Sequence, residues 1–268
     1  MPQTSCVDAS PTTAEAGRLQ PPFVAAVRAQ LASEIGAHEE AWLAQPENLA
    51  VFAMQNGSNA DRERMLCDTL RWRIMHRERL SSLTCTHCAA DPRSHDCRIF
   101  GTDTEGDAVI MNGMALPKEL SPAGVAEHMT CVFEHALRRF PGSAARPRKF
   151  TWVVDIHGFG YLSRHSDPRT SLKLLSLLRS GYKGRLKRIL VVDAPTSFWA
   201  LWAAVRQAID EDTAAMVEFV PWEDVPLRYP ALFGDGLGAR MLKEAMANRD
   251  PACVAAKEWT TFFADGDL

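Results

Sequence analysis

The sequence lacks both a long hydrophobic run and an excess of charge of one sign. Its apolar stretches are interrupted by Asp193, Arg206 or Asp210, well short of the roughly 20 residues that a membrane-spanning helix requires. Thirty lysines and arginines stand against 33 aspartates and glutamates, and the net charge of −3 removes the broad electrostatic argument for a nucleic-acid partner. We therefore expect neither a bilayer-spanning chain nor a nucleic-acid-binding protein.

Features of secreted proteins are also scarce. Residues 1–21 are rich in Pro, Ser, Thr and Ala and contain no apolar run, so they do not resemble a secretory signal, and we expect a mobile tail there. The seven cysteines are an odd number, which argues against a disulfide scaffold and for a reducing compartment. The resulting expectation is a cytoplasmic protein.

Signatures of nucleotide binding and of hydrolysis are missing or weak. No GxxxxGK[ST] phosphate loop occurs, and the glycine-rich segment 234–238 follows no evident buried strand, so a turn is expected there. Ser163, His165 and Asp167 supply the atoms of a triad within five residues, but triads are assembled from separated elements, and no GxSxG elbow is present. We expect a non-enzyme that requires no cofactor. A serine esterase using Ser163 or Ser171 stays as an alternative.

Residues 22–80 have helical periodicity. Leu66, Leu70 and Ile74 recur with a spacing of four, which predicts an amphipathic helix with Asp61 as its N-cap. This part of the chain therefore predicts a small N-terminal helical lobe.

Strand and helix signals alternate in the rest of the chain. Short β-branched and aromatic runs predict strands at 108–111, 150–156, 189–192 and 216–220. The intervening helices are predicted to start at Ser121-Pro122, at Asp167-Pro168 and at Thr196 or Ser197. Single helices between strands favour parallel pairing with right-handed crossovers. The sequence therefore predicts an α/β fold with a mainly parallel sheet flanked by helices.

Between the lobe and the alternating region, residues 81–98 have no periodicity, which indicates a linker or an ordered loop. Cys85 and Cys88 have the CxxC spacing of a zinc knuckle, and His95 and Cys97 follow closely. These ligand types suit tetrahedral zinc, although His95-Asp-Cys97 is not the usual second pair of such a site. Free thiols that pack the loop are the other interpretation, and both stay open.

Several motifs, in a fixed order, resemble those of one family. Residues 177–220 contain a Tyr, an Arg-Leu pair and a strand that leads into Asp193-Ala-Pro, with Phe198 and Trp202 after it. Upstream, residues 101–109 resemble a Gly-x-Asp-x-x-Gly-x-x-Val hairpin, and Trp72-Arg73 resembles the end of an N-terminal lobe. This combination is similar to the CRAL-TRIO (Sec14-like) lipid-binding domains over roughly residues 47–250.

The resemblance implies a helical lobe (22–80) packed on a CRAL-TRIO-like lobe (99–250), with the linker 81–98 between them and a C-terminal extension at 251–268. It also implies a lipid or other small hydrophobic ligand in an apolar pocket closed by a gate helix within 196–234. Such a pocket is needed because moving a 16-carbon chain into water costs about 13 kcal/mol at ~0.8 kcal/mol per methylene. The lipid-binding residues that the resemblance implies are Trp152, Val154, Phe198, Trp202, Val205, Ile209, Thr213, Met216, Phe219 and Val220.

The same comparison argues against a phosphoinositide ligand. Relatives that bind phosphatidylinositol have Thr-x-x-Lys before the last strand, whereas here Thr213 is followed by Met216, and the segment 52–57 contains no basic residue. A buried phosphate would lack a charged partner. We therefore expect a less charged lipid, carried or sensed during transient contact with a membrane surface. A protein-interaction scaffold of the same fold with a collapsed pocket, with or without zinc in its loop, is the alternative.

Overall fold

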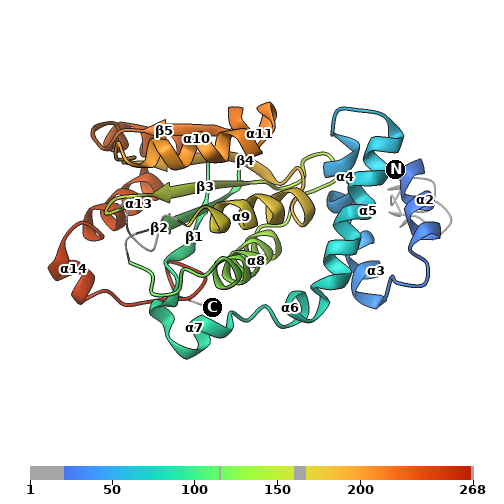
Figure 1. Cartoon of the computed structure of the whole chain (residues 1–268), viewed down its shortest axis with the longest axis horizontal. Coiled ribbons are helices and arrows are strands. Elements are labelled where there is room, and N and C mark those ends of the chain that lie inside the picture. The colour runs from blue at the N-terminus through green and yellow to red at the C-terminus, as the bar shows by residue number, and fades with distance from the viewer. Residues whose placement is uncertain (1–20, 115, 160–166, 267–268) are drawn as a thin grey trace, which may run out of the picture.

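The first helices of the described part of the chain form a lobe at one end of the molecule (Figure 1). The computed structural model describes residues 21–114, 116–159 and 167–266, so the expected tail lies outside the described residues except for Pro21. The lobe consists of α2 (Pro22–Gln30), α3 (Ala37–Leu43), α4 (Pro46–Ala53) and α5 (Asn59–Met75). Its helices share a core of their own that includes Phe23, Leu31, Phe52 and Leu66.

Helix α5 begins earlier than its apolar periodicity predicts. Its N-cap is Ser58 and not Asp61: the Ser58 hydroxyl accepts a hydrogen bond from the Asp61 backbone N–H at 3.2 Å. The Asp61 carboxylate in turn accepts one from the Ser58 backbone N–H at 2.9 Å. Asp61 is therefore the acidic partner in a capping box that Ser58 begins.

In the described part of the chain, five strands form one sheet, in the order in which they occur in the sequence. They are β1 (Cys97–Thr102), β2 (Ala108–Gly113), β3 (Phe150–Asp155), β4 (Leu186–Val192) and β5 (Val217–Val220). β1 and β2 are antiparallel, and every later pair is parallel. The predicted α/β class with a mainly parallel, helix-flanked sheet is confirmed.

This strand order decides where the connecting helices lie. The crossovers contain α8 (Pro122–Arg139), α9 (Pro168–Ser180), and α10 (Phe198–Ala208) with α11 (Glu211–Ala215). Because each crossover advances by one strand in the same direction and right-handed connections are the rule, the helices collect on one face. The caps predicted for the first two helices are confirmed, since Ser121 and Asp167 accept hydrogen bonds from backbone N–H groups of the first turn.

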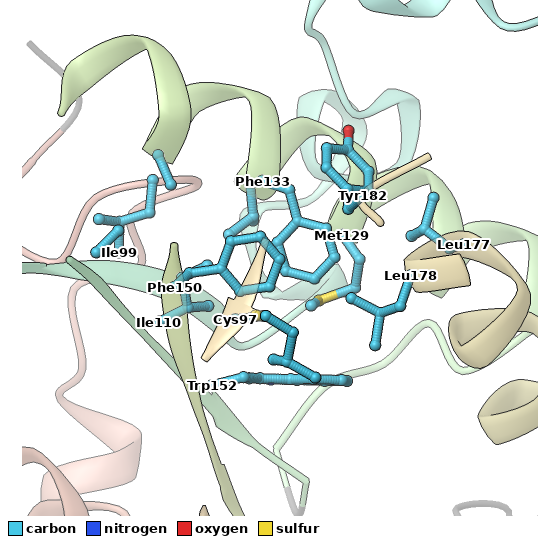
Figure 2. Packing of buried hydrophobic residues seen from close by; sticks show 14 residues of the cluster. Cys97, Ile99, Ile110, Met129, Phe133, Phe150, Trp152, Leu177, Leu178 and Tyr182 are labelled. Carbon is cyan, nitrogen blue, oxygen red and sulfur yellow. The ribbon is translucent and has the colours of Figure 1, made fainter. Parts of the chain in front are cut away.

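The core between this face and helices α8 and α9 is aromatic at its centre (Figure 2). The rings of Phe133 on α8 and Phe150 on β3 stack with their centroids 4.4 Å apart. Tyr182 meets both rings edge-on and is almost fully buried. These contacts fix α8 on the sheet.

The opposite face is covered by α12 (Val225–Phe233) and α13 (Asp235–Ala247), which follow the short 3₁₀ turn η4 (Trp222–Asp224). The turn predicted at 234–238 is wrong in its extent. Gly234, at a φ of 80°, ends α12 alone, and the next residues already belong to α13. Gly238 is inside α13. The position needs a glycine, because the Pro230 backbone passes so close that a Cβ would lie 2.6 Å from the Pro230 nitrogen.

We expect Gly238→Ala to destabilise the protein by about 1–3 kcal/mol, because the added methyl group meets backbone atoms that cannot rotate away. Gly236, in the same helix, is the matched control, since a Cβ there has no atom within 4 Å. Gly236→Ala should be neutral or stabilise by up to about 1 kcal/mol through helix propensity. Urea unfolding of both variants measures this, and equal stabilities would contradict the packing argument.

The segment between the lobe and the sheet is ordered and partly helical. It contains α6 (Arg77–Ser82), α7 (Thr86–Ala90) and the 3₁₀ turn η2 (Pro92–Ser94), and the end of the predicted linker forms the start of β1. After α14 (Pro251–Ala255) the chain returns to this edge strand, where the Ile99 N–H donates to the Phe262 carbonyl at 2.8 Å. None of the helices in the described ranges has the length and apolarity needed to span a bilayer.

Candidate functional site

A cavity of about 140 Å³ lies between the sheet and helices α8, α9 and α10. Its floor comes from β3 and the residue after it, and each helix contributes apolar side chains to its walls. Figure 2 shows the Trp152 ring, which belongs to the floor, together with Met129 and the neighbouring core. The apolar lining includes Val125, Met129, Trp152, Val154, Ile156, Leu174, Phe198 and Leu201.

Helix α10 covers this cavity without being anchored deeply. No side chain along α10 is fully buried, in contrast to α8, where ten residues are. The aromatic residues of α10 gather around Phe219 of β5, with ring centroids 4.6 Å away for Trp199, 5.3 Å for Trp202 and 6.3 Å for Phe198. Helix α10 is thus less deeply buried than α8, which covers the same face of the sheet.

Two buried polar atoms on residues that line the cavity make no hydrogen bond within the described chain: Trp152 Nε1 and His95 Nε2. Leaving such atoms unpaired costs free energy, so a ligand atom that pairs with one would be favoured. Apart from His95 and His128, the charged side chains that line the cavity are acidic. They are Asp96, Glu119 and Asp167, and no Lys or Arg among the described residues lines the cavity.

A group of four buried side chains lies at one end of this cavity. Cys85, Cys88, His95 and His128 place one ligand atom each within 4.8 Å of all the others. A hydrogen bond from Cys88, assisted by His128 and His95, lowers the pKa of the Cys85 thiol although burial opposes this. Burial lowers the pKa of His95 and favours its neutral ring. The four residues offer the donor atoms of a tetrahedral metal site.

The group differs from the predicted ligand set in one member. His128, on α8, is part of it, whereas Cys97 points from β1 into the core between the sheet and α8. Cys97 is so fully buried among apolar groups that the pKa of its thiol is raised well above its usual range. Sequence reasoning missed His128 because it lies in an ordinary amphipathic helix, and only the packing of α8 brings it to the loop.

Residues 93–227 match the family model of the CRAL/TRIO domain. This chain belongs to the CRAL/TRIO domain family. Among solved structures, the crystal structure of Sfh5, a Sec14-like protein, is similar to it with a TM-score of 0.51 and 18% sequence identity. That likeness covers 70% of this chain and 78% of that chain, and at this identity it concerns the fold alone. No curated protein matches the sequence.

The CRAL/TRIO family binds small hydrophobic lipid ligands, and its members are generally not enzymes. Of the ten residues implied to bind lipid, Trp152, Val154 and Phe198 line the cavity. Trp202 and Phe219 form the aromatic contact that seats α10 beside it. These five residues therefore gather at one place, on the face that α10 covers.

The other five lie outside this group, and none of them lines the cavity. Val205 is half-buried on α10, and Ile209 is buried just after that helix. Thr213 and Met216 line a separate open groove beside the N-terminal lobe. Val220 packs against α12 and α13, because alternation along β5 turns its side chain to the opposite face of the sheet from Phe219.

The separate groove has a volume of about 580 Å³ and a mixed charge. Asp210, Glu211 and Asp212 line it together with Arg179 and Lys183. The Arg179 guanidinium already donates to the Ala208 carbonyl at 2.8 Å and lies 3.6 Å from the Asp210 carboxylate. Carboxylates in this groove therefore outnumber the cationic side chains by three to two.

The two candidate nucleophiles of the esterase alternative have different positions. Ser163 and His165 lie outside the described residues. Ser171, on α9, lines the cavity, but no histidine within the described ranges hydrogen-bonds to it. A serine nucleophile needs such a base within hydrogen-bond reach.

Proposed function

We propose that this chain is a non-enzymatic carrier or sensor of a lipid, which it holds between the sheet and α10. The observation that carries the proposal is the apolar cavity roofed by a helix that has no fully buried side chain. An acyl or isoprenoid chain placed there is shielded from water by Trp152, Leu174 and Leu201. Family membership supports the same ligand class.

The described conformation is the closed one in this proposal. Ligand pockets for drug-sized molecules have volumes of roughly 300–1,000 Å³, so a cavity of about 140 Å³ must expand to admit a lipid. Outward movement of α10 provides the space, since this helix forms one wall and is held by aromatic contacts with Phe219 and Phe159 and not by buried residues of its own. The gate in this proposal is α10, which is shorter than the expected range 196–234. The rest of that range has other places, since β5 belongs to the sheet and α12 covers the opposite face of the sheet.

The ligand is a lipid without a negative charge in this proposal. The described lining offers a phosphate no Lys or Arg to pair with, and apart from the histidines its charged side chains are carboxylates. The unpaired Trp152 Nε1 donor instead suits a hydroxyl, carbonyl or ester oxygen. We therefore propose an uncharged alcohol, ketone or ester lipid in place of a phosphoinositide.

Loading takes place during transient contact with a cytoplasmic membrane surface in this proposal. Trp199 on α10 and Leu172 on α9 each keep 47% of their surface exposed, and the two helices are in contact. Exposed large apolar side chains beside a gate suit insertion into the interface of a bilayer.

A transfer assay between vesicles tests the function. Donor vesicles of phosphatidylcholine carry a trace of a fluorescent cholesterol ester, a fluorescent long-chain alcohol or fluorescent phosphatidylinositol, and acceptor vesicles carry a quencher. Accelerated transfer of an uncharged probe, with phosphatidylinositol unaffected, is the expected result. No acceleration of any probe, with the protein recovered free of lipid, would contradict the proposal and favour the scaffold alternative, which the small cavity volume also suits.

A further inference from the structure

We propose that Cys85, Cys88, His95 and His128 bind one structural zinc ion, which ties the segment between the two lobes to helix α8. Cys85 Sγ lies 3.6 Å from His95 Nδ1, and Cys88 Sγ lies 3.3 Å from His95 Nδ1 and 3.4 Å from His128 Nδ1. Ligand atoms about 2.0–2.3 Å from a tetrahedral zinc ion are separated from each other by distances of this size. The inference does not depend on lipid binding.

The hydrogen bonding of His128 prepares its ring for a metal. His128 Nε2 lies 2.8 Å from the Cys97 carbonyl oxygen, which can only accept, so Nε2 carries the proton. In the neutral ring Nδ1 then has a free lone pair, and this atom faces the Cys88 sulfur. Fixing the tautomer of a ligating histidine through its other nitrogen is what second-shell groups do in zinc sites.

Burial and charge also fit zinc. All four side chains are at most 5% exposed, and they come from two stretches of chain, residues 85–95 and α8. Two thiolates and two neutral imidazoles cancel the charge of Zn²⁺, so the occupied site can be buried without a net charge. Four protein ligands leave no open position, which is the pattern of a structural and not of a catalytic site.

The position of the site indicates which parts of the molecule a bound ion would hold together. Cys85 and Cys88 of the inter-lobe segment pack against Cys131, which lies on α8 one turn after His128. His95 and His128 also line the cavity. A bound ion would therefore hold the inter-lobe segment against α8 and fix one end of the cavity wall.

The test is metal analysis of the full chain, produced with zinc in the medium and kept reduced. We expect about one zinc per chain in the wild type and below about a tenth in Cys88→Ala and His128→Ala. Cys97→Ala and Cys131→Ala are the matched controls, since both remove a buried thiol beside the site but not a proposed ligand. Both controls should keep the metal.

Cobalt substitution of the wild type makes the result independent of how the variants fold. Cobalt(II) bound by two sulfurs and two nitrogens should give visible bands of tetrahedral geometry and a sulfur-to-metal charge-transfer band. Wild-type protein that takes up neither zinc nor cobalt while its thiols are free, or that contains a Cys85–Cys88 disulfide, would overturn the proposal. Loss of metal from Cys97→Ala to the same extent as from Cys88→Ala would overturn the ligand set.

Discussion

An Arg73→Met variant is expected to lose about 3–5 kcal/mol of folding free energy, because it leaves a buried carboxylate without the guanidinium that hydrogen-bonds to it. Arg73 of α5 is 3% exposed and donates to Glu134 of α8 with an Nη1–Oε1 distance of 2.8 Å. The Tyr182 hydroxyl donates to the same carboxylate at 3.1 Å. This pair connects the N-terminal lobe to the lobe that contains the sheet.

The exposed pair Arg64–Asp61 is the matched control within the same helix, and Arg64→Met should change stability by less than about 1 kcal/mol. Removing both charges, in Arg73→Met with Glu134→Leu, should recover much of the loss, since no charge is then left buried. Chemical denaturation of the three variants measures these differences. A loss below about 1 kcal/mol for Arg73→Met alone would show that the pair does not secure the contact between the lobes.

The same pair predicts a pH dependence. Burial alone would raise the pKa of Glu134, but the Arg73 charge and its hydrogen bond bring the pKa below the usual 4.5. A carboxyl whose pKa is lowered in the folded state contributes stability above its unfolded pKa, and this contribution is lost as the pH falls through the folded value. The stability lost between neutral pH and about pH 3 should therefore be smaller in the double variant than in the wild type.

A Leu201→Trp variant is expected to reduce lipid binding about tenfold or more while the fold survives. Leu201 lines the cavity from the gate helix, and a larger ring there fills the space that a lipid chain would use. Overpacking of a closed space costs about 1–3 kcal/mol, and 1.4 kcal/mol corresponds to a factor of ten in affinity. The measurement is the amount of uncharged lipid recovered per chain after incubation with vesicles.

Ala203→Trp provides the control on the same helix, because Ala203 is exposed and does not line the cavity. It adds the same aromatic group to α10 and should leave lipid recovery unchanged. Equal recovery from Leu201→Trp and wild type would mean that the ligand does not enter the space beneath α10.

Local signals were sufficient for the architecture but not for the walls of the cavity. Ser121 and Asp167 start their helices by hydrogen bonds within one turn, so the sequence alone could locate them. The resemblance implies a lipid contact at Val220, but this side chain faces α12, because an apolar run does not tell which face of a strand meets which helix. Gly238 was likewise misinterpreted, since its close contact with Pro230 exists only after α12 and α13 have packed.

The metal group illustrates the same limit. Cys85, Cys88 and His95 are close in sequence, and the spacing of the two cysteines indicated a knuckle. The fourth member, His128, joins them only because α8 packs beside α7 and η2, which no spacing rule reveals. Cys97 lies nearer than His128 to the other three ligands in the sequence, but its side chain points from β1 into the core.

Native mass spectrometry of the freshly purified full chain tests the central claim most directly. The account predicts a species heavier than the polypeptide by the mass of one uncharged lipid, which disappears on gentle activation and is depleted in Leu201→Trp. Zinc would add its own, separate mass. A spectrum that contains only lipid-free protein, from a host rich in uncharged lipids, would contradict the carrier account.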